Sequence, residues 1–147
     1  MRIETPFGPA WAAVNAAGEL TAFGFGEPKL DGGGENPEVA CQSKEYFAGT
    51  RQHFDLPLAP RGSTFQHQVW AELRRIPYGE TITYAELARR IGHPGAARAV
   101  GRANATNPIA LIIPCHRVIG TNGKLTGYAY GTKLKEQLLN WERRGLG

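Results

Sequence analysis

The rest of the chain is organised around residues 107–120, which read Asn107-Pro108-Ile109-Ala110-Leu111-Ile112-Ile113-Pro114-Cys115-His116-Arg117-Val118-Ile119-Gly120. An apolar run ends at Pro114, and because proline fixes φ and has no N–H, a regular strand should end there. A strand that continued would point Cys115 and His116 to opposite faces. Both residues can serve one pocket only if a turn or a short helix begins at this point.

Cys115 is the candidate nucleophile of this stretch. A thiol reacts as the thiolate, and a neighbouring base or cation lowers its pKa from the free value of about 8.5. His116 supplies a base and Arg117 a cation. The alternative is that Cys115 is a small buried hydrophobe, the commoner role of a lone cysteine after an apolar run. The adjacency of Cys and His leaves both interpretations open.

The size and composition of the chain set limits on its class. A chain of 147 residues can hold one domain or two small ones. The apolar run from Ile109 to Ile113 is far shorter than the ~20 residues that span a bilayer, and no secretion signal is visible. Two cysteines, Cys41 and Cys115, fit a reducing compartment, so a cytoplasmic location is expected, at the nucleoid in a prokaryote. Cys41 is expected to pack on a helix face.

Charge is distributed unevenly along the chain. Residues 1–60 carry four Lys or Arg against eight Asp or Glu, a net charge of −4, whereas residues 61–147 carry thirteen against five, a net charge of +8. Basic charge gathered on one segment is typical of nucleic-acid binding. Scattered solubilising charge is the alternative, but it does not usually partition this sharply. The sequence therefore favours nucleic acid as a partner.

The acidic half reads as a scaffold without a chemical motif. Turn residues interrupt short, partly alternating segments in residues 1–26, which predicts an antiparallel hairpin or meander. Residues 27–37 are predicted to form a loop, residues 38–47 a helix, and residues 52–58 one more strand. No Cys/His cluster in this half could make a zinc site.

The basic half is predicted to be mostly helical, over residues 64–75, 84–91, 96–104 and 133–144. Thr83 and Glu86 have the spacing of a capping box that starts the second of these helices. The second and third helices, joined by a turn that contains glycine, form a helix-turn-helix pattern.

The predicted helix over residues 96–104 has mostly small side chains, with Arg98 and Arg102 as its only large ones. A helix inside a bundle normally carries larger apolar anchors, whereas small side chains let a backbone approach a narrow or shallow groove closely. From the sequence alone, Arg98 fits a phosphate contact or a salt bridge equally well.

Five short motifs follow one another along the second half of the chain. They are Arg98-Ala99-Val100-Gly101, Asn107-Pro108, Pro114-Cys115-His116-Arg117-Val118, Gly123-Lys124-Leu125-Thr126-Gly127-Tyr128, and Lys135-Glu136-Gln137-Leu138-Leu139-Asn140-Trp141-Glu142. In these motifs and their spacing, the chain resembles the O6-alkylguanine-DNA alkyltransferases, the methylated-DNA–protein-cysteine methyltransferases. The resemblance is specific over residues 61–147 and loose before them.

The resemblance implies an α+β fold with two domains. Residues 1–60 would form a small N-terminal antiparallel-sheet domain of ribonuclease H-like kind, which serves as a scaffold. Residues 61–147 would form a helical, winged-helix-like domain that contains the helix-turn-helix, binds DNA and accepts the alkyl group.

The resemblance also implies the reaction. An alkyl group, typically methyl, would pass from O6-alkylguanine in double-stranded DNA to Cys115 after minor-groove binding and base flipping, with O4-alkylthymine as a further candidate substrate. The thioether has no route back to the thiolate, so each chain would act once, as a methylated-DNA–protein-cysteine S-methyltransferase. No cofactor and no metal are expected, and the protein is expected to be a monomer.

The catalytic roles are carried over by resemblance. Cys115 is the acceptor, and His116 takes its proton through a water. Glu142 holds the imidazole in the required tautomer, and Tyr84 donates toward the guanine ring. Asn107 ties the helix-turn-helix to the active-site segment.

The binding roles come from the same resemblance. DNA contacts are assigned to Ala97, Arg98, Arg102 and Arg117, with Arg98 filling the gap left by the flipped base. The substrate pocket is assigned to Asn104, Val118, Tyr128, Ala129 and Tyr130. Many family members have Gly-Gly where this chain has Tyr130-Gly131. Tyr130 is therefore expected to narrow the mouth of the pocket and to disfavour bulky adducts.

Two other interpretations remain. A non-catalytic, alkyltransferase-like protein would bind the lesion with the same helix-turn-helix, but such proteins usually have tryptophan at the position of Cys115. A winged-helix regulator with a buried cysteine would leave the joint match of Tyr84, Asn107, His116 and Glu142 unexplained.

Overall fold

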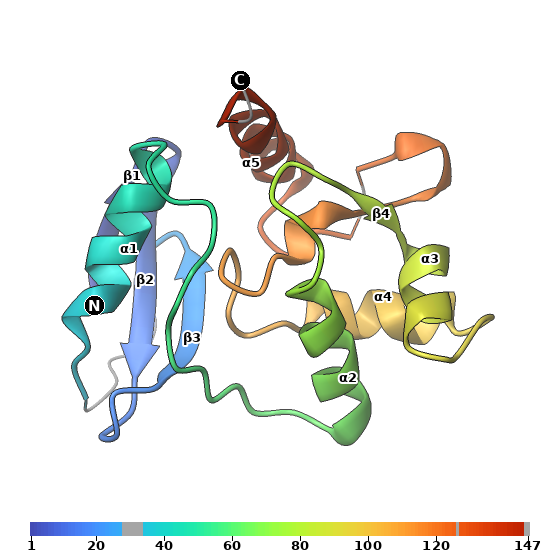
Figure 1. The fold of residues 1–147 in the computed structure, drawn as a ribbon, viewed down its shortest axis with the longest axis horizontal. Helices are drawn as coiled ribbons and strands as arrows, with labels where there is room; N and C mark the ends of the chain where they lie inside the picture. The colour runs from blue at the N-terminus through green and yellow to red at the C-terminus, as the bar shows by residue number, and fades with distance from the viewer. Residues whose placement is uncertain (28–33, 126, 146–147) are drawn as a thin grey trace. The chain divides into compact units, whose positions relative to one another are not determined.

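The computed structural model describes residues 1–27, 34–125 and 127–145 (Figure 1). Most of the predicted loop over residues 27–37, and Thr126 of the motif that ends at Tyr128, lie outside the described residues. The backbone divides into two compact units. One comprises Met1–Arg61 with Pro108–Ile112, and the other comprises Gly62–Asn107 with Ile113–Gly147.

Helices and strands are mixed along the chain, as predicted for an α+β fold. In the first unit they are β1 (Arg2–Thr5), β2 (Gly8–Val14), β3 (Leu20–Phe25) and α1 (Pro37–Phe47). In the second unit they are α2 (Thr64–Leu73), β4 (Ile82–Thr83), α3 (Tyr84–Arg90), α4 (Ala97–Ala105), the 3-10 helix η1 (Cys115–Arg117), β5 (Val118–Ile119), the 3-10 helix η2 (Thr121–Gly123) and α5 (Thr132–Gly145).

The antiparallel meander predicted for residues 1–26 is confirmed. The sheet has the order β1-β2-β3, with Ile3 opposite Ala10 and Ala12 opposite Phe23. Ala10 and Phe23 are completely buried, so this sheet forms the core of the first unit.

The apolar segment Pro108–Ile112 belongs to the first unit, although the division drawn from the sequence placed it with residues 61–147. The N–H of Phe23 donates to the carbonyl of Pro108, and the N–H of Ala110 donates to the carbonyl of Phe23, both at 2.9 Å. The segment therefore pairs with the free side of β3 before the chain reaches Cys115. A domain division based on local composition cannot detect this long-range pairing with β3.

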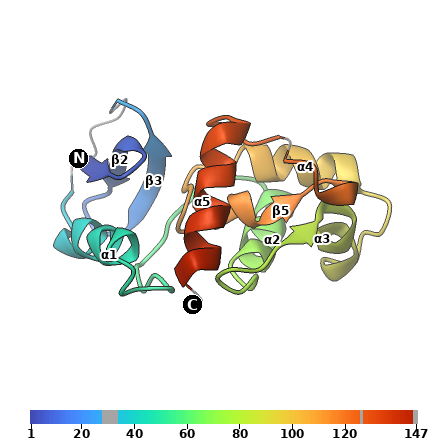
Figure 2. The same ribbon diagram turned by 90° about the horizontal axis from the view of Figure 1, so that it is seen from above.

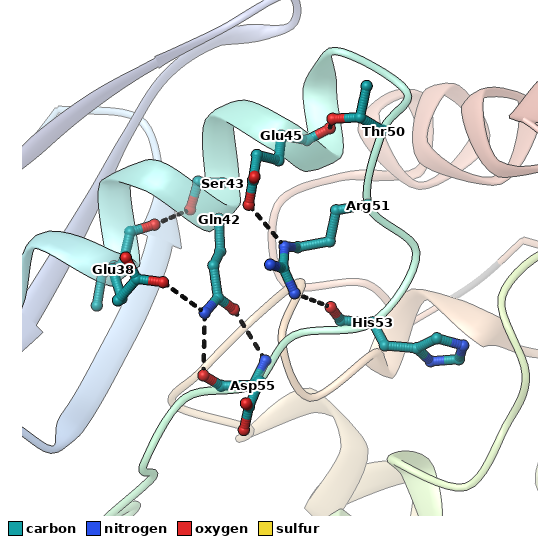
Figure 3. A network of polar contacts seen from close by, with 9 residues as sticks. Glu38, Gln42, Ser43, Glu45, Thr50, Arg51, His53 and Asp55 are labelled. Carbon is teal, nitrogen blue, oxygen red and sulfur yellow. Dashed lines mark hydrogen bonds and ion pairs between the residues drawn. The ribbon is translucent and has the colours of Figure 1, made fainter.

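Polar contacts join residues 50–55 to α1 (Figure 3). The Gln42 amide donates to the carbonyl of Asp55 at 3.0 Å and accepts from the N–H of Asp55 at 2.8 Å. Arg51 binds the carboxylate of Glu45 at 2.9 Å and the carbonyl of His53 at 2.8 Å. These side chains take the backbone bonds that a neighbouring strand would have used.

The strand predicted over residues 52–58 is therefore wrong. Within the described part of this segment, Leu58 alone forms a β-bridge, to Leu20. Cys41 is also not the packing residue expected, because it is exposed. The buried face of α1 is formed by Val39, Gln42, Ser43 and Tyr46, and Cys41 lies off that face.

The helices of the second unit agree with their predicted bounds to within two residues, and local caps explain their starts. The Thr83 hydroxyl accepts from the N–H of Glu86 at 3.1 Å. The Glu86 carboxylate binds Arg89 and Arg90. A full capping box also lies at the start of α2, where the side chains of Ser63 and Gln66 each accept from the other residue's backbone N–H.

The three helices α2, α3 and α4 pack around Leu73, Leu87 and Val100, which are completely buried. The indole N–H of Trp70 donates to the carbonyl of Ala103 at 2.8 Å and joins α2 to α4. On the other side, η1 and β5 lie between α5 and these helices (Figure 2). Parallel pairing of β4 with β5 sets Ile82 opposite Val118, so the start of α3 lies beside the segment that carries Cys115.

In the described residues, no helix combines the length and the apolar character that crossing a membrane requires.

Candidate active site

Cys115 begins the 3-10 helix η1 directly after Pro114, which confirms that a short helix follows the apolar run. The N–H of Cys115 donates to the carbonyl of Ile113 at 2.7 Å, and the N–H of Arg117 donates to that of Pro114 at 3.0 Å. The amide of Asn104 donates to the carbonyl of Cys115 at 3.3 Å. The turn is thus held in place by backbone bonds and by a side chain from α4.

The Cys115 thiol lies in a buried setting and is only 5% exposed. Burial raises its pKa to about 11, while a hydrogen bond from Asn107 and the positive charge of Lys135 act in the opposite direction. Asn107 also donates to the carbonyl of Ile113 at 2.8 Å and so links the end of α4 to the segment that leads to Cys115. The resting cysteine is therefore a thiol, and it needs a base before it can react.

His116 and Glu142 form a buried pair. Nε2 of His116 lies 2.9 Å from Oε2 of Glu142, and both side chains are completely buried. Because an ionised carboxylate only accepts hydrogen bonds, Nε2 is assigned the proton and Nδ1 the lone pair. Nδ1 has no hydrogen-bond partner among the described residues. The imidazole thus presents a basic nitrogen on the side away from Glu142.

Arg117, which the resemblance assigned to DNA contact, points into the protein in this structure. Its side chain is buried, and Nε and Nη2 donate to the two carboxylate oxygens of Glu142, each at 2.8 Å. Its Nη1 donates to the carbonyl of Ile76 at 2.8 Å, and its guanidinium lies 5.7 Å from the centre of the Tyr78 ring. The η1 helix turns this side chain inward, which a sequence motif does not reveal.

The charge of Glu142 is stabilised although the residue is buried. Burial raises the pKa of this carboxyl, but its interactions with His116 and with the Arg117 guanidinium outweigh burial and bring the pKa well below its usual range. The N–H of Gly79 also donates to Oε1 at 3.4 Å. Glu142 is therefore a carboxylate throughout the neutral pH range.

Of the predicted pocket residues, Asn104 and the N–H of Val118 bond the carbonyl of Cys115, and Ala129 is exposed. Tyr128 is buried and packs edge-to-face on Tyr130, with ring centres 5.8 Å apart. Burial raises the pKa of Tyr130, and a negative charge on Cys115 raises it further. Asn104 and Val118 are also buried.

Tyr84 is the first residue of α3, which begins at the edge of the site. Gly127 has φ +70°, and a Cβ on it would lie 3.0 Å from the Tyr84 hydroxyl oxygen. The chain thus uses a glycine where its backbone approaches Tyr84. On α4, Arg98 and Arg102 are exposed and Ala97 is partly exposed.

Lys135 is the residue of the site that sequence reasoning missed. It is completely buried, its ammonium lies 5.7 Å from the centre of the Tyr84 ring, and burial lowers its pKa to about 8. The buried face of α5 is Lys135, Leu138, Leu139 and Glu142. This helical spacing is visible in the sequence, but a lysine and a glutamate within it do not by themselves indicate a buried face.

No group of three or more His, Cys, Asp or Glu side chains that could hold a metal ion occurs within residues 1–27, 34–125 and 127–145.

Comparison with known proteins gives a consistent result. Residues 64–144 match the family described as "6-O-methylguanine DNA methyltransferase, DNA binding domain". A methylated-DNA–protein-cysteine methyltransferase of Methanosarcina acetivorans is 51% identical, over 95% of this chain and 94% of its own length. One of Mycolicibacterium paratuberculosis is 55% identical over 80% of this chain and 74% of its own.

A solved structure shows the same similarity. The Mycobacterium tuberculosis OGT in complex with DNA superposes with a TM-score of 0.90 at 46% identity, over 98% of this chain and 92% of that one. The family match covers residues 64–144, and the Methanosarcina acetivorans relative extends over 95% of the chain. This chain therefore belongs to the 6-O-methylguanine DNA methyltransferase family, whose members are named methylated-DNA–protein-cysteine methyltransferases.

Proposed function

We propose that the protein repairs O6-alkylguanine in double-stranded DNA by moving the alkyl group, methyl in the simplest lesion, to the sulfur of its own Cys115. The observation that carries this proposal is that Cys115 and the adjacent residue His116 are both buried, with the His116 imidazole held by the buried carboxylate of Glu142. The family to which the chain belongs supports the same activity.

The need for a base follows from the burial of Cys115. With a thiol pKa of about 11, forming the free thiolate at pH 7 would cost roughly 5 kcal/mol, at about 1.4 kcal/mol per pKa unit. Nδ1 of His116 is the nitrogen with a free lone pair, and a water between it and the sulfur would carry the proton. The positive charge of Lys135 favours the thiolate as it forms.

The transfer itself is an in-line displacement at carbon. The sulfur of Cys115 attacks the alkyl carbon, the bond from that carbon to O6 breaks, and the bonding electrons leave with the guanine. The thiol proton goes to His116, and Tyr84 donates a hydrogen bond or proton toward the guanine ring, which limits its negative charge. The product is a thioether, so each chain acts once and needs no cofactor.

Access to O6 requires that the base leave the duplex, at a cost of a few kcal/mol. We assign DNA contact to α4, whose small residues permit close approach and whose Arg98 and Arg102 side chains are exposed. Arg98 would occupy the space left by the flipped base. The pocket would then be closed by Tyr128, Ala129 and Tyr130, with backbone carbonyls at Cys115 and Val118 facing the guanine amine.

The finer features of the fold are also part of this proposal. The antiparallel order β1-β2-β3 followed by α1 supports a ribonuclease H-like arrangement for the scaffold unit. The α2–α4 helices with the β4–β5 pair support a winged-helix-like arrangement for the DNA-binding unit. A reactive thiol that must stay reduced fits the cytoplasm, and a protein that acts once on one base can act as a monomer.

Mass spectrometry tests the proposal directly. After incubation with duplex DNA that carries O6-methylguanine, each chain should hold one added methyl group, on Cys115. Cys115→Ser should still bind the lesion and transfer nothing. Repeated turnover, or methyl transfer to the exposed Cys41, would overturn the mechanism. Lesion binding by the wild type without any transfer would favour the alternative, a non-catalytic lesion-binding protein.

A further inference from the structure

The guanidinium of Arg117 and the carboxylate of Glu142 form a closed pair inside the second unit. Three of the N–H groups of Arg117 are used within the protein, two by Glu142 and one by the carbonyl of Ile76. Both side chains are buried, with Glu142 at 0% and Arg117 at 6% exposure. Two-point contact of this kind fixes the plane of the carboxylate. Oε2 is thereby placed to accept from His116 as well.

The charges of this cluster determine which form of His116 is favoured. A carboxylate alone beside an imidazole favours the protonated, cationic ring, because opposite charges attract strongly where water is excluded. A protonated imidazole has no lone pair and cannot take a proton from a thiol. Because Arg117 already neutralises Glu142, adding a proton to His116 would give the buried group a net positive charge, which burial opposes.

The other groups around His116 do not replace Arg117. Cys115 is neutral at rest, and the phenols of Tyr78 and Tyr128 have pKa values raised by burial, so they are neutral as well. On α5, Lys135 lies seven residues, or about two helical turns, from Glu142. Arg117 is thus the cation in direct contact with the carboxylate that holds the imidazole.

We propose that Arg117 is a positioning residue for the transfer reaction: it fixes and neutralises Glu142, so that His116 stays a neutral base with its proton on Nε2. This inference rests on the proposed function and assigns a new role to a residue that its sequence motif alone would place at the DNA. It requires that the rate of methyl transfer fall on the acid side of the pH profile, and that Arg117 set the pH of that fall.

The decisive experiment measures single-turnover methyl transfer between pH 5.5 and pH 9 for three variants. Arg117→Met should move the acid-side fall of the rate upward by about one pH unit or more, so that the rate at any fixed pH on the acid side of the fall drops about tenfold. Arg117→Lys keeps the charge and should leave the fall near its wild-type pH, with a severalfold lower rate from the lost two-point contact. Arg117→Met combined with Glu142→Gln removes both charges and should return the acid-side fall of the transfer rate to its wild-type pH or below.

Controls separate this role from others. Arg51→Met removes a partly exposed arginine that pairs with Glu45 and should change nothing. In a Cys115→Ser background, Arg117→Met should bind lesion DNA as well as its parent. Weaker binding would show that Arg117 contacts DNA. An equal loss of transfer rate at every pH, without a shift of the acid-side fall, would show that its role is purely structural. Either result would overturn the proposal.

A measurement on the intact protein covers the case in which the Met variants do not fold. Nitrogen NMR of the His116 ring at pH 7, assigned by its absence from His116→Gln, should show a neutral ring protonated at Nε2. A doubly protonated ring would overturn the proposal. This result does not depend on catalysis. If the wild type transferred no methyl group at any pH, the proposed function would be refuted, but the NMR spectrum would still report the protonation state of the His116 ring.

Discussion

Replacing Lys135 by methionine should make the protein more stable and slower at the same time. Lys135 is completely buried, and burial lowers its pKa from 10.5 to about 8. At about 1.4 kcal/mol per unit, holding this charge inside the folded state costs about 3 kcal/mol at pH 7. The aromatic ring of Tyr84, 5.7 Å away, offsets part of the cost. We expect Lys135→Met to raise the free energy of unfolding by about 1–3 kcal/mol.

The pH dependence of this gain has a defined sign. Below the folded-state pKa of about 8, the folded and the unfolded protein both carry the proton, so the cost is fully present. As the pH rises through 8 toward 10.5, the folded protein sheds the proton before the unfolded one does. The wild type therefore gains stability in this window, and the advantage of Lys135→Met should shrink there.

The loss of activity has a separate cause. The charge of Lys135 lowers the pKa of the Cys115 thiol, so its removal makes the thiolate harder to form. An interaction of about 1.4–3 kcal/mol at a partly screened buried site corresponds to a rate about tenfold to a hundredfold lower. Urea unfolding at pH 7 and pH 9.5 and single-turnover methyl transfer measure the two effects.

Lys133→Met is the matched control, because it removes an exposed lysine from the same helix and should alter neither quantity. A Lys135→Met protein less stable than the wild type at pH 7 would show that the contacts of the ammonium outweigh its burial. An unchanged transfer rate would show that the lysine does not act on Cys115.

Three further outcomes follow from the same geometry. Arg98→Ala should weaken lesion binding, whereas Glu142→Gln should leave binding nearly intact and slow transfer; equal loss of binding in both, measured by fluorescence anisotropy, would make Glu142 a structural residue. Tyr130→Gly should speed the reaction with free O6-benzylguanine and change repair of O6-methylguanine in DNA much less, with a modest loss of stability because glycine loosens the loop; an unchanged ratio of the two rate constants would mean that the ring points away from the pocket. Gln42→Ala should lower the free energy of unfolding by about 1–3 kcal/mol, because it leaves the N–H and carbonyl of Asp55 without their partner; chemical denaturation that shows no change would mean that water replaces both bonds.

Features encoded by neighbouring residues were determined by the sequence alone. Pro114 ends the apolar run and Thr83 caps α3, because each acts on backbone groups within a few positions of itself. The helix bounds follow for the same reason. The motif around Cys115 likewise indicated the nucleophile and the base, since both belong to one short turn.

The position of each long charged side chain was decided by the tertiary structure. Arg117 meets Ile76, 41 residues away, and Glu142, 25 residues away, so its burial depends on how α2, η1 and α5 pack. Lys135 is buried by the same packing. The free energy of holding a charge inside depends on partners and on excluded water, which no local pattern of residues specifies. The sequence therefore names the groups that react, and the packing of the second unit decides which of them is charged, neutral or held in place.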